Sequence, residues 1–363
     1  MIPDIMYKAC KLERLFPFSR LIFTLLLALL SFQLPAAEMS GLYRAGVPVT
    51  GQGNDEREAA IKRALSEVLV KVTGQRSTLS NKGVIQSLKN ASALVRSFGY
   101  ERRDTGSGQQ LFLQVRFNEA AVNRLLREND LGIWGSNRPD TIVWLAIEKQ
   151  GGRQVLREEA DSPLVSDLEH VMAARSLPLT LPLMDFEDNA AISDVDVWGL
   201  FSDKLGQASR RYGSEAVLGG RLSEVRGRHY NGRLVLLFKN QQFDATVADL
   251  SAEGLALAIA DLIGNSLSRH YAVLSGGSSV NPMLVVEGIA STQDYAGLIK
   301  YLKGLTAVRD VMAVKVGGNK IQLELLIDGT LSQLSDAIAL GRKMRATGAD
   351  EVNQTLQYRW LGG

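Results

Sequence analysis

The stretch Leu284–Ile327, LVVEGIASTQDYAGLIKYLKGLTAVRDVMAVKVGGNKIQLELLI, decides the fold of the C-terminal part of this 363-residue chain. It opens on an apolar run, Leu284–Ile289, which predicts a strand. Apolar residues at helical spacing follow over Thr292–Gly304, and two β-rich runs, Val308–Val316 and Lys320–Ile327, flank a Gly-Gly-Asn turn. The order strand, helix, strand, strand begins a ferredoxin-like unit.

The remaining sequence completes this unit, which we place at residues 281–363. A helix is predicted over Leu331–Arg342 and a last strand over Thr355–Trp360, so the whole order is βαββαβ. Both predicted helices open on residues that fit a capping box: Ser291 with Asp294, and Thr330 with Gln333.

Two more units precede it. Residues 139–274 alternate apolar strands with amphipathic helices, which predicts a central α/β layer sandwich with a partly antiparallel edge. Residues 38–138 predict an N-terminal α+β domain with a long helix over Asn54–Thr73. Residues 275–280 are rich in Gly and Ser and predict a linker. The expected fold class is therefore α/β and α+β in a multi-domain chain.

The N-terminal 37 residues have the layout of a secretory signal peptide. An apolar block of 14 residues, Leu21–Leu34, follows scattered basic residues and precedes Pro-Ala-Ala. We expect cleavage after Ala37 and a periplasmic location; an uncleaved membrane anchor is the alternative, although the block is shorter than the ~20 residues of a spanning helix. Since Cys10 is the single cysteine, the cleaved chain has no disulfide, thiol nucleophile or thiolate metal site.

Charge and motifs exclude several classes of function. The whole chain has 41 Lys and Arg against 39 Asp and Glu, and the balance after residue 37 is zero, so the basic footprint of a nucleic-acid-binding protein is missing. His170, His229 and His270 are far apart and match no metal motif. The turn Gly51–Gly53 lacks the third glycine of a phosphate loop. We therefore predict no cofactor, no metal and no catalytic residue.

Two clusters remain as candidate binding sites. Trp134, Asn137 and Arg138 lie at the joint between the first two units, where they either lock the units together or line a groove; locking is the favoured role. Asp185, Glu187 and Asp188 are part of an acidic cluster after an apolar strand, a place where α/β sheets often bind ligands. The alternative for this second cluster is a solvated loop with helix caps.

Several strings resemble a known family. Leu42–Val49, Ala64–Gly74 and Ile133–Pro139 together with Trp144 resemble the proteobacterial "domain of unknown function 2066" family. This resemblance implies an exported envelope protein and carries no known reaction. The string Tyr212–Gly220 is similar to the α/β domain shared by the N-terminal part of the Tol-system periplasmic protein and the curli-secretion and penicillin-binding-protein-activator lipoproteins, which are adaptors.

These observations favour a non-enzymatic binding or adaptor protein for envelope assembly or maintenance. Its expected partners are envelope proteins, with peripheral contact to the inner membrane as a further option, and the oligomeric state stays open. The alternative is an enzyme or small-ligand sensor that acts on envelope glycan or lipid. Its pocket would lie near Trp134 and Arg138 or at the acidic loop after Met184.

Overall fold

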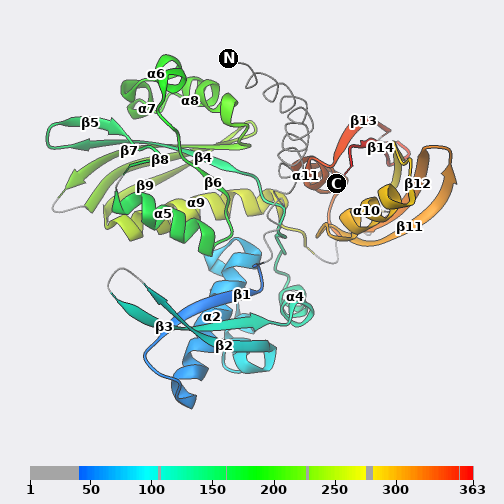
Figure 1. Cartoon of the computed structure of the whole chain (residues 1–363), viewed down its shortest axis with the longest axis horizontal. Coiled ribbons are helices and arrows are strands. Elements are labelled where there is room, and N and C mark those ends of the chain that lie inside the picture. The colour runs from blue at the N-terminus through cyan, green and yellow to red at the C-terminus, as the bar shows by residue number, and fades with distance from the viewer. Residues whose placement is uncertain are drawn as a thin grey trace, which may run out of the picture. The chain divides into compact units, whose positions relative to one another are not determined.

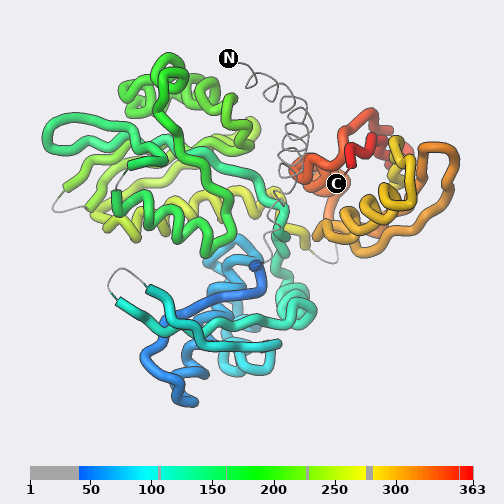
Figure 2. The backbone as a smooth tube through the Cα atoms, in the orientation of Figure 1, coloured from blue at the N-terminus to red at the C-terminus, as the bar shows by residue number. Residues whose placement is uncertain are grey.

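Three β-sheets, each with helices and a core of its own, make up the computed structural model (Figures 1 and 2). The structure describes residues 41–104, 108–160, 162–225, 229–274, 281–350 and 352–362. The expected signal peptide and the expected linker 275–280 lie outside the described residues. The fold class predicted from sequence, a multi-domain mixture of α/β and α+β, is confirmed.

The N-terminal sheet has the antiparallel order β1-β3-β2. Its strands are β1 (Arg44–Val49), β2 (Val95–Asp104) and β3 (Gln109–Phe117). Apolar side chains on alternate positions of β1 and β3 pack against α2 (Asn54–Thr73), as the period of two requires. Further helices are η1 (Arg76–Ser80), α3 (Lys82–Leu88), η2 (Ala91–Leu94) and α4 (Glu119–Glu128).

The central sheet has the order β5-β4-β7-β8-β9, with β6 paired to β4. β4 is parallel to β7 and β6, whereas β7, β8 and β9 are antiparallel, so the predicted antiparallel edge is present. The strands are β4 (Thr141–Lys149), β5 (Gly152–Val155), β6 (Leu179–Thr180), β7 (Ala216–Val225), β8 (His229–Phe238) and β9 (Gln241–Leu250).

Helices cover both faces of this sheet. One face packs against α5 (Pro163–Ala174) and α9 (Ala252–Tyr271), and the other against α6 (Phe186–Ala191), α7 (Asp194–Trp198) and α8 (Ser202–Ser209) (Figure 1). The first seven residues of β4 are all buried, as expected for a strand between two helical layers. The chain therefore forms the predicted layer sandwich.

The α6–α8 layer differs locally from the sequence prediction. α7 ends at Trp198, Leu200 adopts φ 54°, and α8 and η3 (Arg210–Tyr212) follow as separate helices. The acidic stretch expected as a loop contains α6. Asp185 begins this helix because its side chain accepts a hydrogen bond from the backbone N–H of Asp188.

The C-terminal sheet has the order β11-β12-β10-β14-β13, covered by two helices. Its elements are β10 (Met283–Glu287), α10 (Thr292–Lys303), β11 (Val308–Gly317), β12 (Lys320–Ile327), α11 (Leu331–Gly341), β13 (Met344–Asp350) and β14 (Thr355–Trp360). Both predicted capping boxes are present. β13 is an added edge strand that the sequence does not reveal, because its residues after Met344 are largely exposed and show no apolar alternation.

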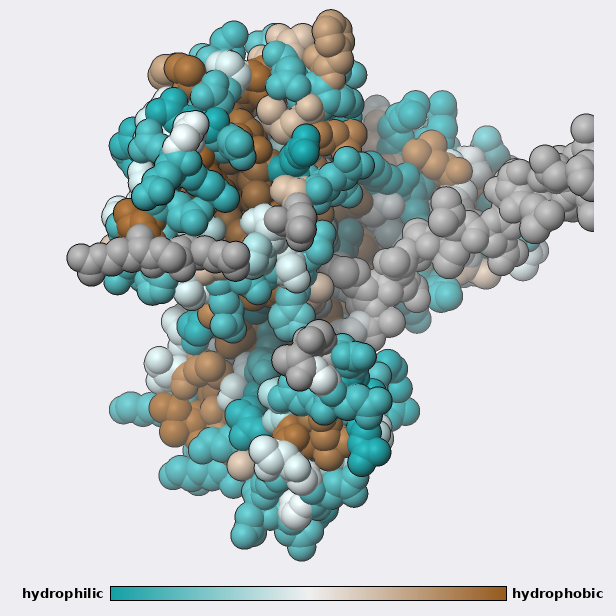
Figure 3. All heavy atoms as spheres, turned by 60° about the vertical axis from the view of Figure 1, so that its left-hand side comes forward, coloured by the Kyte–Doolittle hydropathy of each residue, from teal (hydrophilic) through white to brown (hydrophobic). Residues whose placement is uncertain are grey.

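Hydrophilic residues cover most of the face drawn in Figure 3, and hydrophobic residues show through in separate patches. Among the described helices, none combines the length and the apolar character needed to cross a bilayer. Small exposed apolar patches are normal on folded proteins, so an individual patch needs a further argument before it is assigned a function.

The end of α2 approaches α9 closely, and two glycines permit this. Gly74 ends α2 in the left-handed conformation at φ 75°, and a Cβ added to Gly264 in α9 would lie 2.5 Å from the Gly74 carbonyl oxygen. We expect Gly264→Ala to lower the free energy of unfolding by about 1–3 kcal/mol, measured by urea denaturation. Gly206→Ala in α8, where a Cβ meets nothing within 4 Å, should raise it by about 0.5–1 kcal/mol. Equal stability of the two variants would contradict this packing.

Candidate functional site

The side chain of Arg138 connects the N-terminal and central sheets through four backbone carbonyls. Its guanidinium donates to Lys71 O at 2.5 Å, Arg175 O at 2.9 Å, Trp134 O at 3.0 Å and, from Nε, Gly135 O at 2.9 Å. Lys71 lies in the last turn of α2 and Arg175 is the C-terminal cap of α5. The negative ends of two helix dipoles therefore face one cation.

Arg138 is buried, and its charge is held by carbonyls and an aromatic ring. The guanidinium carbon lies 4.3 Å from the centroid of the Trp134 ring, a cation–π geometry. In the described ranges no carboxylate comes within ion-pair distance of it. Burial, followed by the nearby charge of Arg175, lowers the pKa of Arg138 to about 9, so it stays protonated at neutral pH.

Trp134 and Asn137 make the other contacts of this joint. Trp134 is fully buried, and its ring stacks on Tyr271 of α9 with 6° between the planes. Its backbone N–H donates to Val72 O at 2.8 Å, and Asn137 donates to Ala337 O of α11 at 2.6 Å. The structure thus brings all three predicted residues of this cluster together, each in contact with elements far along the chain. This geometry supports the locking role.

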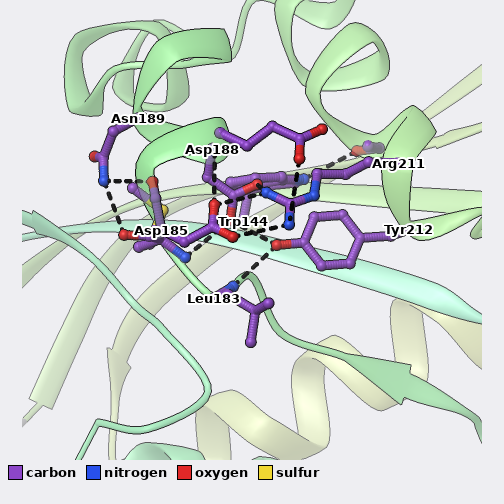
Figure 4. A network of polar contacts seen from close by, with 10 residues as sticks. Trp144, Leu183, Asp185, Asp188, Asn189, Arg211 and Tyr212 are labelled. Carbon is purple, nitrogen blue, oxygen red and sulfur yellow. Dashed lines mark hydrogen bonds and ion pairs between the residues drawn. The ribbon is translucent and has the colours of Figure 1, made fainter.

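The acidic cluster is also engaged inside the protein (Figure 4). Arg211 donates to Asp185 in a bidentate pair, with Nη1–Oδ1 at 2.6 Å and Nη2–Oδ2 at 2.9 Å, and to Asp188 at 3.0 Å. Glu187 lies 3.7 Å from the same guanidinium and is mostly exposed. All three predicted acidic residues therefore gather around a cation that follows α8, where Arg211 and Tyr212 form part of η3.

Asp188 is fully buried, and its oxygens are all occupied. Oδ2 accepts the phenol proton of Tyr212 at 2.5 Å and the backbone N–H of Met184 at 2.8 Å, while Oδ1 accepts from Arg211. Burial, and then the hydrogen bond to Asp188, raise the pKa of Tyr212 to about 12, so the phenol remains a donor. Tyr212 also accepts from the N–H of Leu183, and its ring meets Trp144 edge to face. The network fixes the start of α6.

The chemistry available here is ion pairing and hydrogen bonding. The other acids of the cluster are used locally: Asp196 forms a capping box with Ser193, and Asp194 lies 3.9 Å from Arg153. Among the described residues, no group of three or more His, Cys, Asp or Glu side chains is placed to hold a metal ion.

The segment that contains the acidic cluster also exposes large apolar side chains. Phe186, the first residue of α6, is 91% exposed. Leu183, Val195 and Phe201 are 44–59% exposed, and both α6 and α7 contact α8. We call Leu183, Phe186, Val195 and Phe201 the α6–α8 surface. Large apolar side chains concentrated in one short segment are a mark of interaction sites.

Acidic residues are frequent in the same stretch of sequence. The segment 183–203 contains six Asp and Glu and no Lys or Arg. Over residues 139–274 the sequence has 19 acidic against 13 basic residues. The α6–α8 surface therefore belongs to an acidic stretch of sequence, in which Glu187 and Asp203 are exposed, and electrostatic complementarity favours a partner that carries basic groups.

The sequence alone does not reveal Arg211 as the cation of the acidic cluster, nor the exposure of Phe186. The only signal for Arg211 is its place directly before Tyr212 in a basic pair, which does not say where the side chain points. Exposure of an apolar residue cannot be found from a helix of six residues, since its hydrophobic periodicity is too short to define a face.

A family model described as a domain of unknown function, DUF8605, matches residues 36–135, a span that includes the N-terminal sheet and its helices. No curated protein matches the chain.

Replacing Arg138 tests the joint. Arg138→Met leaves four carbonyls without their donor and should lower the free energy of unfolding by about 2–4 kcal/mol, measured by chemical denaturation. Arg138→Lys keeps the charge but loses the fork of donors, so an intermediate loss is expected. Arg210→Met, at an exposed position, is the control and should change stability by less than about 0.5 kcal/mol. Equal free energies of unfolding for Arg138→Met, Arg138→Lys and Arg210→Met would show that Arg138 does not support the joint.

The Asp185 pair predicts acid sensitivity. Arg211, with the N–H of Asp188, holds the pKa of Asp185 well below its usual range, so the unfolded chain takes up this proton at higher pH than the folded chain. The stabilisation is therefore complete above about pH 4 and is lost as pH falls further. Asn can still cap α6, so Asp185→Asn should lower the neutral-pH melting temperature and flatten its decline between about pH 4 and 2.

Glu187→Gln is the matched control for this titration, since Glu187 is mostly exposed and 3.7 Å from Arg211. Its pH profile should follow that of the wild type. An Asp185→Asn profile parallel to the wild type across this range would show that the ion pair does not contribute to stability.

Proposed function

We propose that the chain is an exported, non-enzymatic binding protein of the bacterial cell envelope that attaches a partner protein through the α6–α8 surface. Export is supported by the sequence layout of residues 1–37. The resemblance to the "domain of unknown function 2066" family supports an envelope location. The similarity of Tyr212–Gly220 to adaptor modules supports binding as the activity.

The observation that carries the proposal is the exposure of Phe186. Burying a Phe side chain on folding or binding contributes about 1.5–3 kcal/mol, and this ring stands almost entirely in solvent. The bidentate Asp185–Arg211 pair and the cap on Asp188 hold the backbone beneath it. A side chain presented on a fixed support loses little entropy when it inserts into a partner's pocket.

The acidic surrounding defines the partner's chemistry. A basic and apolar segment of an envelope protein fits best, because its charges would complement Glu187 and Asp203 while its apolar side chains cover Phe186 and Phe201. Rim charges act mainly on the association rate and on salt dependence. Binding is therefore expected to weaken as salt rises.

The competing function, catalysis or small-ligand sensing at the acidic cluster, has weaker support. The carboxylates of Asp185 and Asp188 accept hydrogen bonds from Arg211, Tyr212 and backbone N–H groups, which occupies the lone pairs that a substrate or proton would need.

Site-specific photo-crosslinking in living cells tests the binding function. A photoreactive amino acid at Phe186 and, separately, at Phe201 should capture the same partner. Val352, which is 92% exposed in the β13–β14 turn, is the control position and should not capture it. Charge reversal by Glu187→Lys with Asp203→Lys should reduce the adduct severalfold, because complementary charges accelerate encounter.

Adducts that are equally abundant at Val352, or that are insensitive to the charge reversal, would contradict the assignment of this surface. The intact mass of the protein isolated from the same cells reports whether residues 1–37 have been removed.

A further inference from the structure

The N-terminal sheet and α4 form a pocket of about 680 Å³ whose wall includes Arg96, Asn118, Glu119, Asn123, Arg124 and Arg127. The pocket is wide and open to solvent. The wall thus has three arginines and one acidic residue. The pocket uses different residues from the α6–α8 surface, so it goes beyond the function proposed above.

A β-bulge supplies the first of these arginines. In the β2–β3 ladder Val95 pairs with Phe117 and Ser97 with Arg116, which leaves Arg96 as the extra residue. Bulges redirect a side chain out of the regular strand alternation and are common next to functional sites. At this bulge the side chain of Arg96 departs from the regular alternation of β2, and it lines the pocket.

The other two arginines come from one face of α4. Arg124 and Arg127 are three residues apart, so their side chains are neighbours on the helix surface. Within the described part of the chain, neither Arg96 nor Arg124 forms an ion pair with a carboxylate. Their charges therefore remain available to a ligand. Glu119 is the acidic residue on the pocket wall.

Two asparagines add hydrogen-bond donors. The Asn118 side-chain oxygen accepts from the backbone N–H of Ala121, and the Asn123 oxygen accepts from the Tyr43 hydroxyl at 2.8 Å. Burial raises the pKa of Tyr43 to about 12, so this hydroxyl remains protonated and donates. Each amide also carries two N–H donors, which add to the donors on the pocket wall. The pocket wall is thus rich in donors.

The charge of the surrounding sequence agrees with this. Residues 41–138 contain 15 Lys and Arg against 9 Asp and Glu, although the chain after residue 37 is neutral as a whole. The excess of basic residues in this part offsets the acidic excess of residues 139–274. An anion approaching the molecule is therefore attracted to the N-terminal sheet.

We propose that this arginine pocket binds the phosphate group of a larger molecule. A phosphate monoester has a charge near −2 and three terminal oxygens, and the guanidinium groups of Arg96 and Arg124, which form no ion pair within the described residues, can each donate to it. Arginine forks fit phosphate oxygens in bidentate fashion. The volume exceeds that of a phosphate ion, so the rest of the ligand occupies the remaining space. The phosphate belongs either to a lipid headgroup or to a soluble phosphate ester.

Two probes with the same headgroup separate these sources. Binding of glycerol 3-phosphate to the purified protein is measured by calorimetry, and binding to phosphatidylcholine vesicles with and without phosphatidic acid is measured by co-sedimentation. Calorimetric binding of glycerol 3-phosphate supports a soluble ester. Sedimentation that requires phosphatidic acid, without binding of the soluble probe, supports a lipid headgroup. Binding of neither probe overturns the proposal.

Variants tie the binding to the pocket. Arg96→Gln with Arg124→Gln should weaken the dissociation constant at least about tenfold, since each charge-assisted hydrogen bond contributes strongly. Arg102→Gln with Arg103→Gln removes the same charge from exposed positions of β2 outside the pocket and should leave affinity within about twofold. Equal losses in both pairs would mean non-specific attraction and would overturn the proposal.

Asn118→Asp separates binding from folding. Aspartate caps α4 at least as well as asparagine and adds favourable charge at the helix N-terminus, so the melting temperature should be unchanged or higher. The same substitution replaces a donor on the pocket wall by a negative charge, so phosphate affinity should fall at least about tenfold. Unchanged affinity in this folded variant would contradict a phosphate at this position.

Discussion

The guanidinium of Arg138 is the interaction on which the arrangement of the N-terminal and central sheets depends. It joins carbonyls at the C-terminal ends of α2 and α5 and lies over the Trp134 ring. A buried cation without a carboxylate is costly, and here several aligned carbonyl dipoles and an aromatic face offset that cost together. Such a network is stable only when every member is present, so it specifies one geometry for the segments that meet there.

This constraint extends outward through neighbouring contacts. Arg175, whose carbonyl accepts from Arg138, pairs with Asp261 of α9 at 2.9 Å, and Asp261 also meets Arg76 after α2. Gln75 donates to Ser268 of the same helix. α9 therefore serves two cores at once, and its Gly264 permits the close approach of Gly74. These contacts favour a structural role for the joint.

Charge is divided between the parts of the chain, and this division relates the two proposals. The central sequence is acidic around an exposed apolar surface, whereas the N-terminal sequence is basic around a pocket rich in donors. Because the basic and acidic excesses cancel, the total charge of the chain does not reveal either feature. A protein that holds a phosphate-bearing molecule on one part and a basic protein segment on another has the properties expected of an adaptor between components of an envelope.

The sequence by itself determined the fold class, most helices and strands of the C-terminal unit and the start of its two helices. These features follow from local rules: side chains repeat every two residues in a strand and every 3.6 in a helix, and caps act within one turn. The capping boxes at Ser291 and Thr330 needed no knowledge of distant contacts. β13 was not predicted from the sequence, because an exposed edge strand lacks the apolar alternation that marks buried strands.

Only the tertiary structure decided which polar groups meet. Arg138 reaches the Lys71 carbonyl across 67 residues, and Arg211 reaches Asp188 across 23. Such pairs depend on the path of the whole chain, and no local periodicity encodes them. The same holds for the exposure of Phe186 and for the pocket at Arg96 and Arg124, since exposure and concavity are properties of packed elements and not of the segments themselves.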